Sequence, residues 1–308
     1  MKKSTFILFL VFVITVVANA QSDSLIFVSA KWQTEVVHPE VKWITYHFNH
    51  GELFQSNQNI SVLELPAKRK KVKLSIAYSD SLELSSQLAS KSHAIAGING
   101  SYFEMRGKDP DNHPELTAVP HTSPANINRN RSQTYLKIDG KLIAENYAKS
   151  SHVKRYPRGA LAFGKKDISI FKVDTTISNW EHSIRAKNII TSGPMLVSEG
   201  TENSIPDDSF CGKRHPRTAI GVRADGSVLF VVVDGRSNDA NGMNLNEMQK
   251  IMRWLGCVDA LNLDGGGSST MVICEQPFHG VVNHPSDNKK FDHEGEREVA
   301  NAILILEK

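Results

Sequence analysis

The stretch RTAIGVRADGSVLFVVVDG, residues 217–235, narrows the possible folds more than any other part of the sequence. Two apolar runs flank Asp225-Gly226, a pair of residues typical of two-residue β-hairpin turns. A hairpin joins antiparallel strands, so part of the core must be an antiparallel sheet. Short β-branched and aromatic runs elsewhere predict further strands. These strands are expected at residues 25–30, 34–38, 41–48, 72–78, 93–100, 134–139, 141–145, 159–164, 168–173 and 257–264.

Helical patterns occur in two segments, residues 81–90 and 245–255. In the second segment, Asn244 can cap the helix and Glu247 can complete a capping box. One face of that helix would carry Leu245, Met248, Ile251, Met252 and Leu255. Strands outnumber helices and do not alternate regularly with them. The sequence therefore predicts an α+β fold, with a mixed, largely antiparallel sheet core flanked by a few helices.

The first twenty residues resemble a signal peptide. Lys2 and Lys3 precede an apolar block at residues 6–17, and Ala18-Asn19-Ala20 matches an A-x-A cleavage site before Gln21. The alternative is a membrane anchor, but a spanning helix needs about 20 apolar residues. We expect an exported protein, periplasmic or secreted, with no stable membrane anchor after cleavage.

Composition restricts the possible partners and cofactors. The formal net charge of +3 over 308 residues is too small to indicate a nucleic-acid-binding surface. An oxidising compartment would permit one disulfide among Cys211, Cys257 and Cys274, but the spacing does not select a pair or match a zinc site. Residues 106–132 are rich in proline and polar residues and predict a long loop, for which a functional role and a plain insertion are both open.

The stretch LNLDGGGSST, residues 261–270, places three glycines after a strand and a carboxylate. It lacks the lysine of a P-loop. Thr270 stands where a dinucleotide fingerprint or a nucleophile elbow needs glycine. Glycines let backbone amides approach a ligand and form an anion-binding concavity. A β-bulge or tight corner is the structural alternative.

Other polar or glycine-rich turns follow or precede expected strands, and together they predict a shared rim. They are Asn99–Phe103, Ser192–Met195, His215–Thr218 and Asp234–Arg236. For Asp234 the alternative is a turn-forming aspartate, and for Asn99 and Thr218 it is a role in fastening loops. His279, His284 and His293 show no zinc-enzyme spacing, so we interpret them as solvated.

These motifs together resemble the phosphodiester glycosidase family. The likeness is carried, in order, by NGSYF (99–103), SGPML (192–196), RTAIGV (217–222), Asp234-Gly235, NLNEM (244–248), NLDGGGS (262–268) and REVANA (297–302). It covers roughly residues 59–308, which would form the catalytic domain. Residues 21–58 would be a strand-rich N-terminal extension.

The resemblance implies a glycosidase that removes a sugar from a sugar-1-phosphodiester of a glycan or glycolipid and leaves a phosphomonoester. Asp264 is the first choice for the catalytic carboxylate, as nucleophile or as base for water, and Asp234 is the second. The expected substrate-binding residues are Asn99, Arg217, Thr218, Arg236, Gly265, Gly266, Gly267, Ser268 and Arg297. Arginines and glycine amides would stabilise the phosphate, and no cofactor or metal is expected.

Three alternatives stay open from the sequence. The chain could be a non-catalytic glycan- or envelope-binding protein that uses the same rim. It could also be a phosphodiesterase that cuts the P–O bond on the other side of the phosphate. A hard cation near Asp234 and Asp264 is the third alternative, although no EF-hand-like loop supports it.

Overall fold

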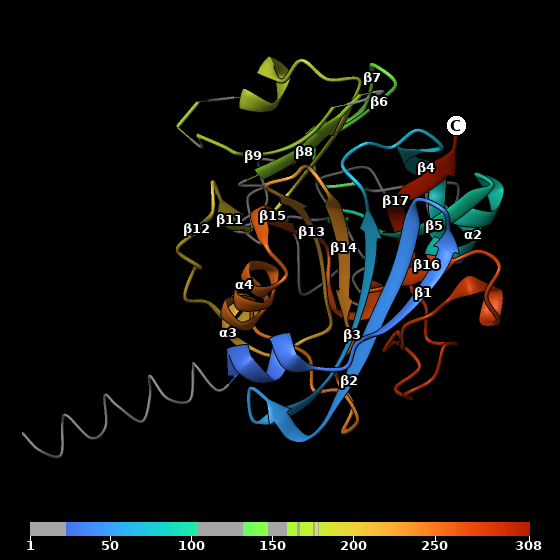
Figure 1. Cartoon of the computed structure of the whole chain (residues 1–308). Coiled ribbons are helices and arrows are strands. Elements are labelled where there is room, and N and C mark those ends of the chain that lie inside the picture. Colours follow the sequence, from blue (N-terminus) through green and yellow to red (C-terminus); the bar gives the residue numbers. More distant parts are fainter. Residues whose placement is uncertain (1–22, 104–131, 147–158, 165–166, 175, 178) are drawn as a thin grey trace, which may run out of the picture.

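The computed structural model describes residues 23–103, 132–146, 159–164, 167–174, 176–177 and 179–308 (Figure 1). The expected signal peptide lies outside these residues, and so does the expected 106–132 loop except for Ser132. In the described part of the chain, no helix has the length and apolarity needed to cross a membrane.

Three antiparallel sheets form the body of the protein, as the hairpin pattern predicted. The eight-stranded sheet has the order β1-β2-β3-β14-β13-β15-β11-β12. Its strands are β1 (Gln33–His38), β2 (Val41–Leu53), β3 (Ser56–Leu65), β14 (Val228–Val233), β13 (Arg217–Arg223), β15 (Cys257–Asn262), β11 (Met195–Ser198) and β12 (Thr201–Glu202). Helices are few beside these strands, so the predicted α+β class is confirmed.

Two smaller sheets complete the strand framework. The five-stranded sheet β7-β6-β10-β8-β9 contains β7 (Lys141–Ala144), β6 (Leu136–Ile138), β10 (Asn188–Ser192), β8 (Gly159–Phe163) and β9 (Ile168–Lys172). The four-stranded sheet β16-β5-β17-β4 contains β16 (Met271–Ile273), β5 (Ala94–Asn99), β17 (Glu298–Glu307) and β4 (Val72–Leu84). The strand β17 was not among the expected strands, although it lies between β5 and β4.

The helices are short. They are α2 (Ser85–Lys91), α3 (Ser209–Gly212) and α4 (Leu245–Trp254), with 3₁₀ turns η4 (Trp180–Ser183), η5 (Gly266–Ser268) and η6 (Phe278–Gly280). The expected helix at 81–90 exists, but it begins at Ser85 because β4 continues to Leu84 and pairs there with Glu298 of β17.

The expected hairpin is formed by β13 and β14. Arg217 pairs with Val233 and Val222 pairs with Val228. At the turn, Gly226 has a φ of +85°, and the Asp225 carboxylate accepts a hydrogen bond from the Ser227 amide at 2.8 Å. This hairpin lies in the middle of the large sheet, so it aligns the strand ends on both of its sides.

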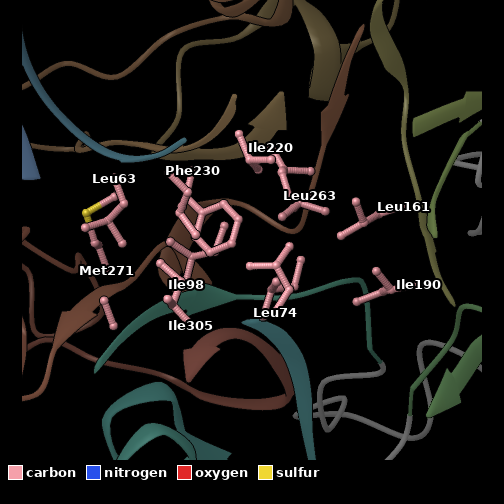
Figure 2. Packing of buried hydrophobic residues seen from close by; sticks show 14 of the residues in the cluster. Leu63, Leu74, Ile98, Leu161, Ile190, Ile220, Phe230, Leu263, Met271 and Ile305 are labelled. Atoms are coloured by element: carbon pink, nitrogen blue, oxygen red, sulfur yellow. The ribbon is translucent and has the colours of Figure 1, made fainter. Parts of the chain in front are cut away.

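The main core lies where the three sheets face one another (Figure 2). Leu63, Ile220 and Phe230 come from the eight-stranded sheet and are fully buried. They meet side chains from the four-stranded sheet, Leu74, Ile98, Met271 and Ile305, and from the five-stranded sheet, Leu161 and Ile190. Each such side chain contributes about 1.5–3 kcal/mol through removal from water. This shared core fixes the three sheets relative to one another.

The opposite face of the large sheet is covered by α4, which packs on β11 and β15. The predicted apolar face is confirmed for Leu245, Met248, Ile251 and Met252, all fully buried. The predicted capping box is confirmed as well. The Asn244 side chain accepts from the Glu247 amide at 2.8 Å, and the Glu247 carboxylate accepts from the Asn244 amide at 3.0 Å.

The expected strand at residues 25–30 is wrong, because residues 23–29 are helical. Only Phe27 of the run LIFV is deeply buried, and its ring contacts Trp32, Phe48 and Trp254. Leu25 and Val28 are more than half exposed. A short apolar run does not distinguish a strand from a helix, and here the docking of one aromatic ring decided the outcome.

The N-terminal segment belongs to the large sheet. The expected boundary at residue 58 falls inside β3, which pairs with β14 over residues 60–65. The strands β2 and β1 extend the same sheet outward from β3.

No disulfide joins the three cysteines, all of which lie in the described part of the chain. Cys211 and Cys257 are buried, and burial raises the pKa of the Cys257 thiol to about 12. Buried thiols of this kind are inert, so they act as packing groups.

The Glu247 carboxylate also binds the Arg214 guanidinium, with Nε to Oε2 at 3.0 Å, and is 11% exposed. We predict that Glu247→Ala lowers the free energy of unfolding by about 1–3 kcal/mol, because both the cap and the ion pair are lost. Glu247→Gln should cost less, since glutamine can still accept from the Asn244 amide. Urea unfolding followed by circular dichroism measures both. Exposed Glu202→Ala is the control, expected within about 0.5 kcal/mol of the parent protein. Equal losses for Ala and Gln would show that the cap contributes nothing.

Candidate active site

The buried side-chain amide of Asn99, at the end of β5, joins the glycine turn to the four-stranded and the eight-stranded sheets. Its Nδ2 donates to the Asp264 carbonyl at 2.7 Å. Its Oδ1 accepts from Thr218 Oγ1 at 2.8 Å and from the Thr270 amide at 3.1 Å. Asn99 and Thr218 are both fully buried. Asn99 and Thr218 were predicted to bind substrate; in this structure their buried side chains hold the glycine turn in position.

The turn itself begins at Asp264, which is half-buried and follows β15 by two residues. The Asp264 carboxylate accepts from the Gly265 amide at 2.9 Å, and the Gly266 amide donates to the Pro216 carbonyl at 2.8 Å. A Cβ on Gly265 would lie 2.9 Å from that same carbonyl, and Gly266 has a φ of +64°. Gly265 is therefore required by close approach and Gly266 by backbone conformation.

Two arginines flank the glycine turn. A Cβ on Gly266 would lie 2.8 Å from Arg236 Nη2, and a Cβ on Gly267 would overlap Arg297 Nη2. Partial burial lowers the pKa of Arg236, and the charge of Arg297 lowers it further, while Asp287 opposes the shift. The effect of the Arg297 charge on Arg236 indicates that the two guanidinium groups are near enough to repel each other. An arginine pair beside backbone amides suits an anion.

Arg297 is also held by a carboxylate. Its Nε and Nη2 donate to the two oxygens of Asp287, both at 2.6 Å, in the bidentate geometry that arginine favours. Arg236, in contrast, is only partly buried and makes a long contact from Nη1 to Ser286 Oγ at 3.4 Å.

Arg217 lies beside the turn, but inside the protein. Its Cδ would be 3.7 Å from a Cβ on Gly265. The side chain is 1% exposed and donates to three backbone carbonyls: Nε to Met243 at 2.8 Å, and Nη2 to Phe210 at 2.6 Å and Lys213 at 2.9 Å. Much of its hydrogen-bonding capacity therefore supports the loops that precede β13 and α4.

Asp234, directly after β14, is buried among donors. Its Oδ2 accepts from Asn59 Nδ2 at 2.7 Å and lies 3.0 Å from His284 Nδ1. Its Oδ1 accepts from Asn283 Nδ2 at 2.8 Å and from the His284 amide at 3.0 Å. These four contacts match the roughly four lone-pair sites of a carboxylate. The carboxylate is therefore fully occupied by protein groups.

His284 is the site residue that sequence reasoning missed. The expectation that it is solvated is wrong: the residue is half-buried, and its ring stacks on Phe291 with centroids 3.9 Å apart. No motif spacing indicates this role, since its partner is 50 residues away in sequence. The local hint is that Asn283-His284 directly follows the apolar pair Val281-Val282.

One hydrogen-bond network joins Asp234 to the glycine turn. Asn283 Nδ2, besides its bond to Asp234, donates to the Ser269 carbonyl at 3.0 Å, and Asn283 Oδ1 accepts from the Met271 amide at 2.7 Å. Within the described residues, the hydroxyls of Ser268, Ser269 and Thr270 are buried without a hydrogen-bond partner. Buried hydroxyl groups usually have hydrogen-bond partners. Three unpartnered hydroxyls side by side make the interior side of the glycine turn polar, as is common at binding sites.

The group with metal-ligand geometry among the described residues lies outside this network. Glu145, Glu181 and His182 have ligand atoms within 4.8 Å of one another. His182 Nε2 is 3.1 Å from the Glu145 carboxylate. These residues adjoin Tyr135, whose pKa is raised by burial and then by the two glutamates.

The antiparallel α+β scaffold places a carboxylate and an arginine pair around one glycine turn, an arrangement that suits an anion. Comparison with known families gives the class: the phosphodiester glycosidase model matches residues 92–306. That match covers most of the chain, so the chain belongs to the phosphodiester glycosidase family.

Individual relatives match over shorter segments. A prophage-derived uncharacterized protein of Bacillus subtilis, YomE, is 43% identical over 90 residues, which are 29% of this chain and 14% of that protein. The N-acetylglucosamine-1-phosphodiester alpha-N-acetylglucosaminidase of Mus musculus is 33% identical over 107 residues, or 34% of this chain and 20% of the mouse protein. The chain thus aligns with only a small part of these relatives' lengths.

Solved structures share the fold over nearly the whole chain. The zebrafish N-acetylglucosamine-1-phosphodiester alpha-N-acetylglucosaminidase catalytic domain, auto-inhibited by its pro-peptide, has a TM-score of 0.63 at 18% identity and covers 90% of this chain and 88% of that chain. A hypothetical protein from Synechocystis has a TM-score of 0.59 at 13% identity, covering 91% of this chain and 64% of that one.

Gly267 tests how tightly the turn is packed. We predict that Gly267→Ala lowers the free energy of unfolding by about 1–3 kcal/mol, since the new methyl group would overlap the Asp287–Arg297 pair. Gly212→Ala is the matched control, because a Cβ there meets nothing within 4 Å. Chemical unfolding of the two variants gives the comparison. A Gly267→Ala protein as stable as the control would contradict the packing described here.

Proposed function

We propose that this chain hydrolyses sugar-1-phosphodiesters, breaking the bond between the anomeric carbon and the phosphate oxygen. The products are a free sugar and a phosphomonoester. The observation that carries the proposal is the convergence of Arg236 and Arg297 on the glycine turn that starts with Asp264. Family membership supports the same reaction, and the names of the mouse and zebrafish relatives describe it in those proteins.

The phosphate would bind against the arginine pair, beside the glycine turn. A phosphodiester carries one negative charge, and the departing phosphate gains charge as the C–O bond breaks. Arginines stabilise this charge where it develops. Because a phosphomonoester has a second pKa of roughly 6, it leaves more readily than a sugar alcohol. A strong general acid is therefore less important here than in common glycosidases.

The sugar would lie on the Asp264 side of the turn. Asp264 belongs to the turn and is half-buried, with its main chain held by the Asn99 side chain and by the Gly100 carbonyl, which accepts from the Asp264 amide at 3.1 Å. In this proposal it acts at the anomeric carbon, either as nucleophile or as base for water. Asp234 is less suited to attack a substrate, because its oxygens are occupied by four protein contacts.

The proposal includes export. It is supported by the positive start, the apolar block at residues 6–17 and the A-x-A sequence before Gln21. An exported enzyme would meet glycan or glycolipid phosphodiesters of the cell envelope or its surroundings.

Product analysis tests the reaction directly. The protein is incubated with a panel of sugar-1-phosphodiesters that vary in sugar and aglycone, and products are identified by mass spectrometry. Free sugar plus phosphomonoester is the expected result. Sugar-1-phosphate plus alcohol would instead assign the phosphodiesterase reaction. Binding of substrates without any sugar release would assign a non-catalytic glycan-binding role.

Asp264→Asn should reduce turnover by about 10²–10⁴-fold without loss of folding, because the amide cannot attack carbon or accept a proton. The matched control is Asp259→Asn on the preceding strand β15, whose carboxylate accepts from the Glu199 amide at 2.9 Å and has no part in the turn. Steady-state kinetics and circular dichroism are measured for both. Asp264→Asn turnover within about threefold of the control would remove Asp264 from the mechanism.

A further inference from the structure

We propose that His284, held by Asp234, is the general base that removes a proton from the attacking water, and that Asp234 is its positioning residue. This inference rests on the proposed function and deepens it. It gives Asp234 a role different from the second-choice nucleophile expected from the sequence.

The contacts of His284 select one tautomer. Nδ1 lies 3.0 Å from Asp234 Oδ2, and a carboxylate oxygen accepts hydrogen bonds. Nδ1 must therefore carry the proton in the neutral ring, since two acceptors at this distance would repel each other. The Asn59 amide, 3.3 Å from Nδ1, already donates to Asp234 Oδ2 at 2.7 Å. Neutral His284 consequently presents Nε2 as a proton acceptor.

Asp234 is built to hold that ring rather than to react. Besides the ring nitrogen it accepts from Asn59, Asn283 and the His284 amide, so its four acceptor sites are filled. It is 1% exposed. A buried, hydrogen-bonded aspartate on Nδ1 of histidine fixes the tautomer and stabilises the imidazolium that forms on proton transfer.

Neighbouring rings restrain His284 as well. It stacks on Phe291 with an interplanar angle of 7°, and the His293 ring lies 4.5 Å away on a tilted plane. His293 Nδ1 is 2.7 Å from the Asn283 carbonyl, and its ring stacks on Phe278 at 4.8 Å. The ring position of His284 is thus set from both its edge and its face, which a catalytic base requires.

Several charged or titratable groups surround this base. Asp234 faces it from the end of β14, and His293 faces it from its own loop. His47 of β2 contacts Phe291, the ring that stacks on His284, with 5.8 Å between the two ring centroids. Arg236 lies two residues after Asp234, and Ser286 lies two residues after His284. Arg236 and Ser286 contact each other, which links the Asp234–His284 pair to the cationic side of the glycine turn.

The chemical step balances with the residues present. In the first step, an Asp264 oxygen bonds to the anomeric carbon while the bond to the phosphate oxygen breaks, and its electron pair leaves with the phosphomonoester. In the second step, water bonds to the anomeric carbon and the Asp264 ester bond breaks, returning the electron pair to the carboxylate. The water proton passes to His284 Nε2 and then to solvent. The sequence of two displacements retains the anomeric configuration.

The decisive variant is His284→Gln, with His182→Gln as control, since His182 also contacts a carboxylate, that of Glu145, but lies outside the site network. We expect kcat/KM for sugar release to fall about 10²–10⁴-fold in His284→Gln and its acidic limb in the pH profile to disappear. Added imidazole should restore part of the rate. His182→Gln should stay within about threefold and keep the acidic limb. His284→Gln activity within threefold of the parent, with an unchanged pH profile, would overturn the proposal.

A second readout does not depend on turnover. Nitrogen-15 NMR of the parent protein should show neutral His284 protonated on Nδ1, and the Nε2-protonated tautomer would overturn the inference by itself. Failure of the proposed function is recognised separately: the parent protein would release no sugar from any phosphodiester of the panel. That result would end both proposals, whereas an active parent with an active His284→Gln variant would end only this one.

Discussion

The geometry of the site depends on the hydrogen bonds of the Asn99 side-chain amide. This amide lies at the end of a strand in the four-stranded sheet, and it bonds both to the hydroxyl of Thr218 in the eight-stranded sheet and to the main chain on either side of the glycine turn. One buried group thus joins two sheets and the turn between them. Burial makes the cost of an unmatched amide high, so the three segments are held in one arrangement. This arrangement fixes the positions of Asp264 and of the glycines that follow it.

Local signals in the sequence predicted most of the fold. The Asp225-Gly226 turn specified the hairpin of β13 and β14, and the Asn244–Glu247 capping box marked the start of α4, because both depend on residues adjacent in sequence. Expectations failed where distant contacts decide. Residues 23–29 are helical because Phe27 docks among rings from other elements. Position in the sheet order is likewise non-local, and it is what makes β17 a buried inner strand.

The site was predictable to a similar degree and for the same reason. The glycine turn and its flanking carboxylate are contiguous in sequence, so their pattern could be interpreted. The placement of Arg236 and Arg297 against neighbouring glycines agrees with the expected shared rim. His284 was out of reach, since its significance arises from a carboxylate 50 residues away and from ring stacking within a polar loop. Sequence also gave no means to separate an arginine that faces a ligand from one, such as Arg217, that serves backbone carbonyls in the interior.

The contribution of β3 has a consequence for the smallest functional unit. Asn59 lies on this strand and donates to the Asp234 carboxylate, yet it precedes the segment 92–306 that the family model recognises. A chain trimmed to that segment would leave β14 with an open edge and remove one donor from a buried charge. The autonomous folding unit is therefore longer than the recognisable family region. Changes in β3 therefore reach the buried Asp234 carboxylate, although Asn59 lies 175 residues before it in the sequence.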